Sequence, residues 1–151
     1  MLNIFNIYED LLLEAKAKNI RYIIENAIKM NMSIRILYKG EGENKPGWRL
    51  IEPYLMGIYN TKQKPLVIRA LQLGRTASLT PDGDGIDPLK ALPNGWRIFR
   101  LDRIIDVKPG TGKFSQSKRP EYNPNDKGMS KILMGVLKTN KRVGDLYFKN
   151  N

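Results

Sequence analysis

The chain has 151 residues, enough for one domain with a hydrophobic core and appended segments. It carries 26 lysines and arginines against 15 aspartates and glutamates, and this net charge of +11 favours phosphate-bearing partners, although a solvated basic surface without a ligand would have the same composition. Neither cysteine nor histidine occurs, which excludes disulfides, thiolate and imidazole metal ligands, and catalysis by a Ser-His or Cys-His pair.

The excess of positive charge is unevenly distributed. Residues 1–31 sum to zero, whereas residues 32–114 carry +6 and residues 115–151 carry +5. We interpret these ranges as an N-terminal helical segment, a β-rich domain and a basic C-terminal extension. No apolar run is long enough to span a bilayer and no signal segment opens the chain, so we expect no membrane association and a cytoplasmic location, or the host cytoplasm if the chain is phage-encoded.

Apolar residues recur at helical spacing over residues 4–15 and again over residues 20–28. Residues 16–19 interrupt the pattern, and Asn19 could cap a second helix. The spacing therefore predicts either two helices or one helix with a break near residue 18. Such stripes usually pack in a core; binding to a membrane surface or to a partner is the alternative.

From residue 32 the apolar residues alternate instead. Four strands are predicted at residues 33–38, 48–58, 65–73 and 96–101, and a short fifth strand at 104–108, which Pro109 and Gly110 are expected to end. Residues 74–95, rich in Gly, Pro and Asp, form a long loop of the kind that is usually functional or mobile. Five short strands after a helix predict an α+β, mainly β fold, with the strands in a small curved barrel.

The C-terminal extension is predicted to be extended over residues 115–124. A short helix is expected around residues 127–138, with Ile132, Leu133, Val136 and Leu137 as its apolar stripe. Residues 146–148 could add an edge strand or dock on the core, and the sequence leaves both open.

Two short motifs do not satisfy the requirements of the sites that they suggest. The string P-G-T-G-K at 109–113 lacks both the earlier glycine of a phosphate-binding loop, where Val107 stands, and the hydroxyl residue after the lysine, where Phe114 stands. The acidic loop at 82–87 does not follow the ligand order of a calcium-binding loop. We therefore predict no catalytic residue, no metal site and no cofactor.

The stretch W-R-I-F-R-L-D-R-I at residues 96–104 places three arginines on or beside one short strand, where unpaired burial would be costly. Alternation sends Ile98 and Arg100 to one face and Arg97 and Phe99 to the other. Arginines held on strands suit bidentate contacts to phosphate or base edges, and aromatic rings can stack on unpaired bases. The candidate arginines are Arg49, Arg69, Arg97, Arg100 and Arg103, and the candidate rings are Trp48, Trp96, Tyr54 and Tyr59.

The competing interpretation pairs these arginines with nearby carboxylates in surface salt bridges. The available acids are Glu52, Asp102 and Asp106, and the pairing of Arg103 with Asp102 is the first expected. We expect half of the arginines to be used in this way.

The chain resembles WYL domains, which are Sm-like, SH3-type barrels of bacterial regulators and phage proteins. The resemblance lies in A-I-K-M-N-M-S-I-R-I-L-Y-K-G (27–40), W-R-L-I-E-P-Y-L (48–55), L-V-I-R-A-L-Q (66–72) and R-I-F-R-L-D-R-I (97–104), followed by G-T-G-K-F (110–114). The namesake tripeptide is absent, because Leu66-Val67-Ile68 stands in its place. The tail Y-N-P-N-D-K-G-M-S (122–130) and the long loop resemble phage members, some of them described as modifiers of suppressor transfer RNAs.

The resemblance implies a five-stranded barrel that binds single-stranded DNA, RNA or nucleotides through basic residues around the third and fourth strands. Carried over by position, these residues are Arg49, Arg69, Arg97 and Arg103, and the last three are implied to share a face. Trp48 and Trp96 complete the predicted interface.

We therefore predict a non-catalytic protein that binds single-stranded or structured RNA or DNA. The alternative is a structural or assembly component of a phage particle, whose basic surface meets an acidic protein. A phosphodiester-cleaving enzyme is disfavoured, since histidine and a clustered carboxylate pair are both missing. The sequence also leaves open a protein partner or association into a homo-oligomer.

Overall fold

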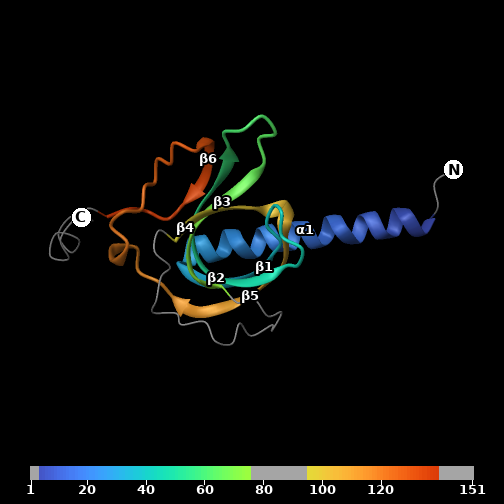
Figure 1. Cartoon of the computed structure of the whole chain (residues 1–151), viewed down its shortest axis with the longest axis horizontal. Helices are drawn as coiled ribbons and strands as arrows, with labels where there is room; N and C mark the ends of the chain where they lie inside the picture. Colours follow the sequence, from blue (N-terminus) through green and yellow to red (C-terminus); the bar gives the residue numbers. More distant parts are fainter. Residues whose placement is uncertain (1–3, 76–94, 140–151) are drawn as a thin grey trace.

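The computed structural model describes residues 4–75 and 95–139, which form one long helix and a curved antiparallel sheet of six strands (Figure 1). Helix α1 covers Ile4–Met30. The strands are β1 (Met32–Tyr38), β2 (Gly47–Tyr59), β3 (Leu66–Arg75), β4 (Trp96–Arg100), β5 (Ile104–Lys113) and β6 (Met129–Gly135). Two single-turn 3-10 helices, η1 (Leu101–Arg103) and η2 (Gln116–Lys118), complete the described elements. The predicted class, α+β and mainly β, is confirmed.

Helix α1 is continuous, so the prediction of two helices is wrong and the alternative break near residue 18 is absent. Residues 16–19 read K-A-K-N, and alanine and lysine are good helix formers that need no apolar stripe to stay helical. The helix ends at Met30, and the next residue, Asn31, has a positive φ of 53° that asparagine tolerates better than most residues. Its C-terminal half packs on the sheet through buried side chains, namely Ile20, Ile24, Ala27 and Ile28.

The strands follow the spatial order β4-β3-β2-β1-β5, and β6 pairs with β2 outside this path. The sheet formed by the described strands is not closed, since β4 and β5 are its outer strands and are joined along the chain by η1. The predicted strand positions are confirmed for β1 to β4 within two residues at each end. The finer prediction of a closed five-stranded barrel is not confirmed.

Strand β5 continues to Lys113, so the prediction that Pro109 and Gly110 end it is wrong. The pairing with β1 shifts between Met32↔Lys113 and Ile34↔Pro109, which marks a bulge in β5. The Ser33 Oγ accepts hydrogen bonds from the backbone N–H of Thr111 at 2.8 Å and of Gly112 at 3.2 Å. The side chain of Ser33 thus satisfies backbone donors that a bulge would leave unpaired.

The predicted helix at 127–138 is wrong, because this segment forms β6. The strand pairs antiparallel with the second half of β2, with Ile58 opposite Lys131. Val136 is buried, but the other members of the proposed helical stripe, Ile132, Leu133 and Leu137, are exposed. Residues 115–124 also depart from an extended conformation, since they contain η2 and turns. Of the predicted loop at 74–95, residues 76–94 lie outside the described residues, and so does the segment 146–148. Residues 74 and 75 belong to β3.

Aromatic side chains attach the C-terminal extension to the sheet. The ring of Tyr54 lies 4.8 Å from that of Phe114 and 4.7 Å from that of Tyr122 between centroids. The Tyr122 hydroxyl donates a 2.7 Å hydrogen bond to the carbonyl oxygen of Val136, just beyond β6. Burial raises the pKa of Tyr122 to about 12, so this hydroxyl stays protonated as a donor at neutral pH.

The packing of β6 on β2 depends on Gly57. A Cβ at this position would collide with the carbonyl oxygen of Lys131 and the Sδ of Met129. We expect Gly57→Ala to lower the free energy of unfolding by about 1–3 kcal/mol, since the overlap displaces backbone. Urea unfolding measures this change, with Thr61→Ala in the exposed β2–β3 turn as the control. An unchanged midpoint for Gly57→Ala would contradict the β6 position.

Candidate nucleic-acid interface

Two of the predicted interface residues, Trp48 and Arg49, are buried in β2. The Arg49 guanidinium donates a 2.6 Å hydrogen bond to Glu43, and its Cζ lies 5.0 Å from the ring centroid of Tyr38 and 5.7 Å from that of Phe99. The positive charge of Arg49 therefore interacts with groups inside the domain, through an ion pair and two cation–π contacts. Trp48, at 3% exposure, presents no ring face on which a base could stack.

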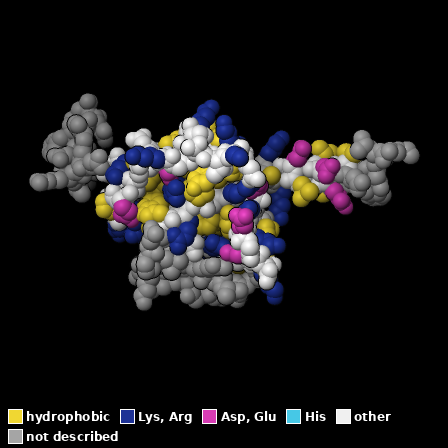
Figure 2. All heavy atoms as spheres, turned by 45° about the horizontal axis from the view of Figure 1, so that its top comes forward, with side chains coloured by type: hydrophobic (Ala, Val, Ile, Leu, Met, Phe, Trp, Pro, Cys, Tyr) yellow, Lys and Arg dark blue, Asp and Glu magenta, His cyan; other side chains and the backbone are white. Residues whose placement is uncertain are grey.

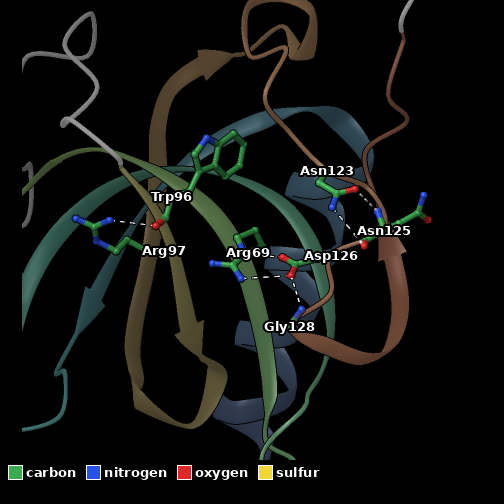
Figure 3. A network of polar contacts seen from close by, with 7 residues as sticks. All are labelled: Arg69, Trp96, Arg97, Asn123, Asn125, Asp126 and Gly128. Atoms are coloured by element: carbon green, nitrogen blue, oxygen red, sulfur yellow. Dashed lines mark hydrogen bonds and ion pairs between the residues drawn. The ribbon is translucent and has the colours of Figure 1, made fainter.

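Arg69 on β3 holds the segment that leads into β6 (Figure 3). Its Nε donates to the Asp126 carboxylate at 2.6 Å, and the same carboxylate accepts the backbone N–H of Gly128 at 2.9 Å. Burial by itself would raise the pKa of Asp126, but the hydrogen bonds from Arg69 and Gly128 outweigh it and hold the pKa below its usual value. Arg69 is therefore a structural contact between β3 and the C-terminal extension.

Arg97 does not share a face with Arg69, so that expectation is corrected. In the β3–β4 register Arg69 lies opposite Ile98 and Arg97 lies opposite Ala70. Residues directly opposite share a face, which sends the two arginines to opposite sides of the ladder. Figure 3 shows the two guanidinium groups apart from each other and on different partners: that of Arg69 on Asp126, and that of Arg97 donating to the Trp96 carbonyl oxygen at 3.0 Å.

The salt bridges also differ from the expected ones. Asp102 pairs with Arg100 at 2.7 Å rather than with Arg103. Hydrogen bonding to Arg100 lowers the pKa of this exposed carboxyl. Glu52 pairs with Arg119 at 3.2 Å, an arginine that the sequence pattern did not single out. Arg103, half-buried on η1, lines a shallow depression beside the β1–β2 loop, and Glu43, the partner of Arg49, lines the same depression. The predicted arginines are not all brought together in one site, because Arg69 and Arg97 lie on opposite sides of the β3–β4 ladder.

Two of the four candidate rings keep exposed surface, Trp96 and Tyr59. Trp96 packs against Tyr122 with 6.1 Å between ring centroids, and its Nε1 donates to Glu121 at 3.1 Å. Tyr59, at the end of β2, lines an open depression together with Glu41, Thr61, Lys62, Gln63, Pro65 and Arg100. Of the two rings, Tyr59 is therefore the one that lies next to an exposed lysine, Lys62.

Exposed lysines from two distant parts of the sequence meet at the end of the β2–β3 hairpin. They are Lys62 and Lys64 in the turn, Lys127 two residues before β6, and Lys131 in β6; we call these four residues the hairpin lysine surface. The backbone N–H of Asn60 donates a 2.8 Å hydrogen bond to the carbonyl oxygen of Gly128, which joins the turn to the start of β6. Figure 2 shows further Lys and Arg side chains spread over the face in view.

This surface could not be recognised in the sequence, because the spacing of residues 127–138 predicts a helix. The helical pattern gives residues 127–138 no particular neighbour in the fold. As strand β6, the segment pairs with β2 and lies beside the hairpin turn. The only signal was charge: two lysines in each of two segments.

No protein-family model, curated protein or solved structure matches this chain. Within residues 4–75 and 95–139, no group of acidic side chains could hold a metal ion. None of the helices in this part of the chain is long and apolar enough to cross a membrane.

The Arg69–Asp126 pair predicts a pH dependence of stability. Because the pKa of Asp126 is depressed in the folded state, its contribution is fully present above the unfolded value of about 3.9 and is lost as the pH falls through the lower folded value. We expect Asp126→Asn to reduce the free energy of unfolding by about 1–3 kcal/mol at pH 7 and by less at pH 3. Urea unfolding at several pH values measures both, with Asp10→Asn on the exposed helix as the control. An equal loss at both pH values would contradict the ion pair.

Proposed function

We propose that this protein binds nucleic acid without catalysis, through contacts of the hairpin lysine surface with the phosphates of single-stranded or structured RNA or DNA. The observation that carries the proposal is a difference between arginine and lysine: arginines form ion pairs within the domain, whereas the hairpin lysines are exposed. The described ion pairs are all made by arginines, with Glu25, Glu43, Glu52, Asp102 and Asp126 as the acids. The hairpin lysines are exposed instead and can meet an external anion.

Lysine contacts imply a particular mode of recognition. An ammonium group binds phosphate as a point charge and lacks the planar fork by which arginine reads a base edge. Binding would then depend on backbone charge and release of counterions more than on sequence. Tyr59 adds a ring beside Lys62 on which an unpaired base can stack, which favours single strands over a continuous duplex.

The resemblance to WYL domains supports the same function, and we extend the proposal to membership of that family. The curved sheet would be an open form of the small barrel, and the protein would act in the cytoplasm. The interface residues would differ from those carried over by position, because Arg49 and Arg69 are occupied by Glu43 and Asp126. Arg97 and Arg103 lie outside the hairpin lysine surface.

Removal of the hairpin lysine charges tests the proposal. A variant with Lys62→Gln, Lys64→Gln, Lys127→Gln and Lys131→Gln should bind a single-stranded oligonucleotide more weakly, with the slope of log affinity against log salt reduced by about 0.7 for each phosphate that is no longer neutralised. Fluorescence anisotropy over a salt series measures both. The matched control replaces four other exposed lysines, Lys39, Lys45, Lys113 and Lys118, and has the same net charge.

Equal losses of affinity in the two variants would contradict a localised site and indicate a general effect of net charge. Oligonucleotide binding that is weak in the wild type, together with salt-sensitive binding of a polyglutamate peptide that only the hairpin variant loses, would overturn the proposal. That result would favour an acidic protein as the partner, as expected for an assembly component.

Tyr59 provides a separate test of base stacking. Tyr59→Leu should weaken binding to single-stranded oligonucleotides by about 1–3 kcal/mol, because leucine offers no π surface. Tyr59→Phe keeps the ring and should bind as the wild type does. The same anisotropy assay measures both variants, and a loss of equal size with Tyr59→Phe would assign the effect to the hydroxyl rather than to stacking.

A further inference from the structure

The N-terminal half of α1 extends beyond the sheet, as Figure 1 shows. Residues 7–19 are all exposed, although several are large and apolar. Tyr8 is 61% exposed and Leu11 is 59% exposed. Tyr22, which follows this range about three turns after Leu11, is 66% exposed. Apolar side chains gathered on one element mark an interaction surface more often than scattered ones do.

Part of this exposed apolar surface forms a stripe of its own, distinct from the side that packs on the sheet, on which the exposed Leu13 lies. Tyr8, Leu11, Ala15 and Tyr22 follow each other at helical spacing. Leu11 and the buried Ile20 are nine residues apart, which at roughly 100° per residue places them on opposite sides of the helix. The exposed stripe therefore faces away from the sheet, and another helix could reach it without meeting the body of the domain.

A row of charges runs along one edge of this stripe, with the acids before the bases. Asp10, Glu14, Lys18 and Arg21 are spaced by four, four and three residues, so they lie on one side of the helix. All four are exposed, and Arg21 donates to Glu25 at 3.0 Å on the surface. Figure 2 shows the same order, with acidic side chains toward the free end of the helix and basic ones toward the domain.

We propose that the exposed stripe of α1 binds the same stripe of a second copy of this chain, with the two helices antiparallel about a two-fold axis level with residues 16–17. In that arrangement Glu14 of each copy lies beside Lys18 and Arg21 of the other, and Leu11 lies near Tyr22. A parallel pair would instead place Asp10 and Glu14 of one copy beside Asp10 and Glu14 of the other, so that like charges would face each other. The order of charges therefore selects the second copy and its orientation.

The interface is small. A two-fold contact uses the same patch on both copies, so one segment must be complementary to itself, as this one is. The contact would belong to the smallest class of interfaces, below about 1,200 Å² in total, and we expect a dimer with a micromolar dissociation constant. This inference does not depend on the proposed nucleic-acid interface, which lies on the β2–β3 hairpin and β6.

Sedimentation of the full chain tests whether the dimer forms. The wild type should shift from monomer to dimer over roughly 1 µM to 1 mM, the range that a weak contact of this kind spans. Leu11→Asp should remain monomeric, while circular dichroism and urea unfolding should stay unchanged because Leu11 is exposed and away from the core. A wild type that is monomeric throughout would overturn the proposal and leave the stripe to a different protein.

Charge exchange tests the antiparallel orientation. Glu14→Lys alone and Lys18→Glu alone should each weaken the dimer, since like charges then face each other. Mixing the two variants should restore association, because each chain supplies the charge that the other lacks. Each variant helix carries the same substitution alone and in the mixture, so any effect of the substitution within its own helix is unchanged. Recovery of the dimer in the mixture therefore reports contacts between the two chains. Glu9→Lys, on another side of α1, is the control with the same change of charge. Absence of recovery in the mixture would overturn the antiparallel pairing.

Discussion

The need to pair the backbone of β2 organises most of this structure. The strand is 13 residues long, but β1 pairs only with its first part, up to Ile51. Past that point the same edge of β2 would expose unpaired N–H and C=O groups, which folded proteins rarely leave inside. Strand β6 supplies the missing partner from Leu55 to Tyr59, and the aromatic contacts of Tyr54 and Tyr122 hold the connecting segment in place.

Burial of guanidinium groups is the second constraint, and it determines which cations can serve a ligand. An arginine in or near the core must have an acidic partner, because an uncompensated buried charge is costly. Arg49 and Arg69 satisfy this requirement with Glu43 and Asp126. These two arginines are therefore occupied inside the domain, whereas the lysines at the hairpin remain exposed, and this contrast is the basis of the proposed phosphate contacts.

The two apolar stripes of α1 show why its length could be predicted only in part. The sequence pattern changes phase between residues 15 and 20, and a change of phase looks like a break. The helix continues, because each stripe faces a different neighbour: the C-terminal one faces the sheet, and the N-terminal one faces solvent. A pattern records which side chains are apolar, but it does not record which side of the helix the core lies on.

The sequence by itself determined the fold class, the positions of the first four strands and the basic character of the domain, since alternation, helical spacing and charge are local properties. Only the tertiary structure decided the identity of β6, the continuation of β5 past Pro109 and the partners of the arginines. Each of these depends on contacts between residues far apart in the chain: Gly57 with Lys131, Ser33 with Thr111, and Arg69 with Asp126. A segment with a weak local preference takes the conformation that its neighbours' unpaired groups require, and those neighbours are known only once the chain has folded.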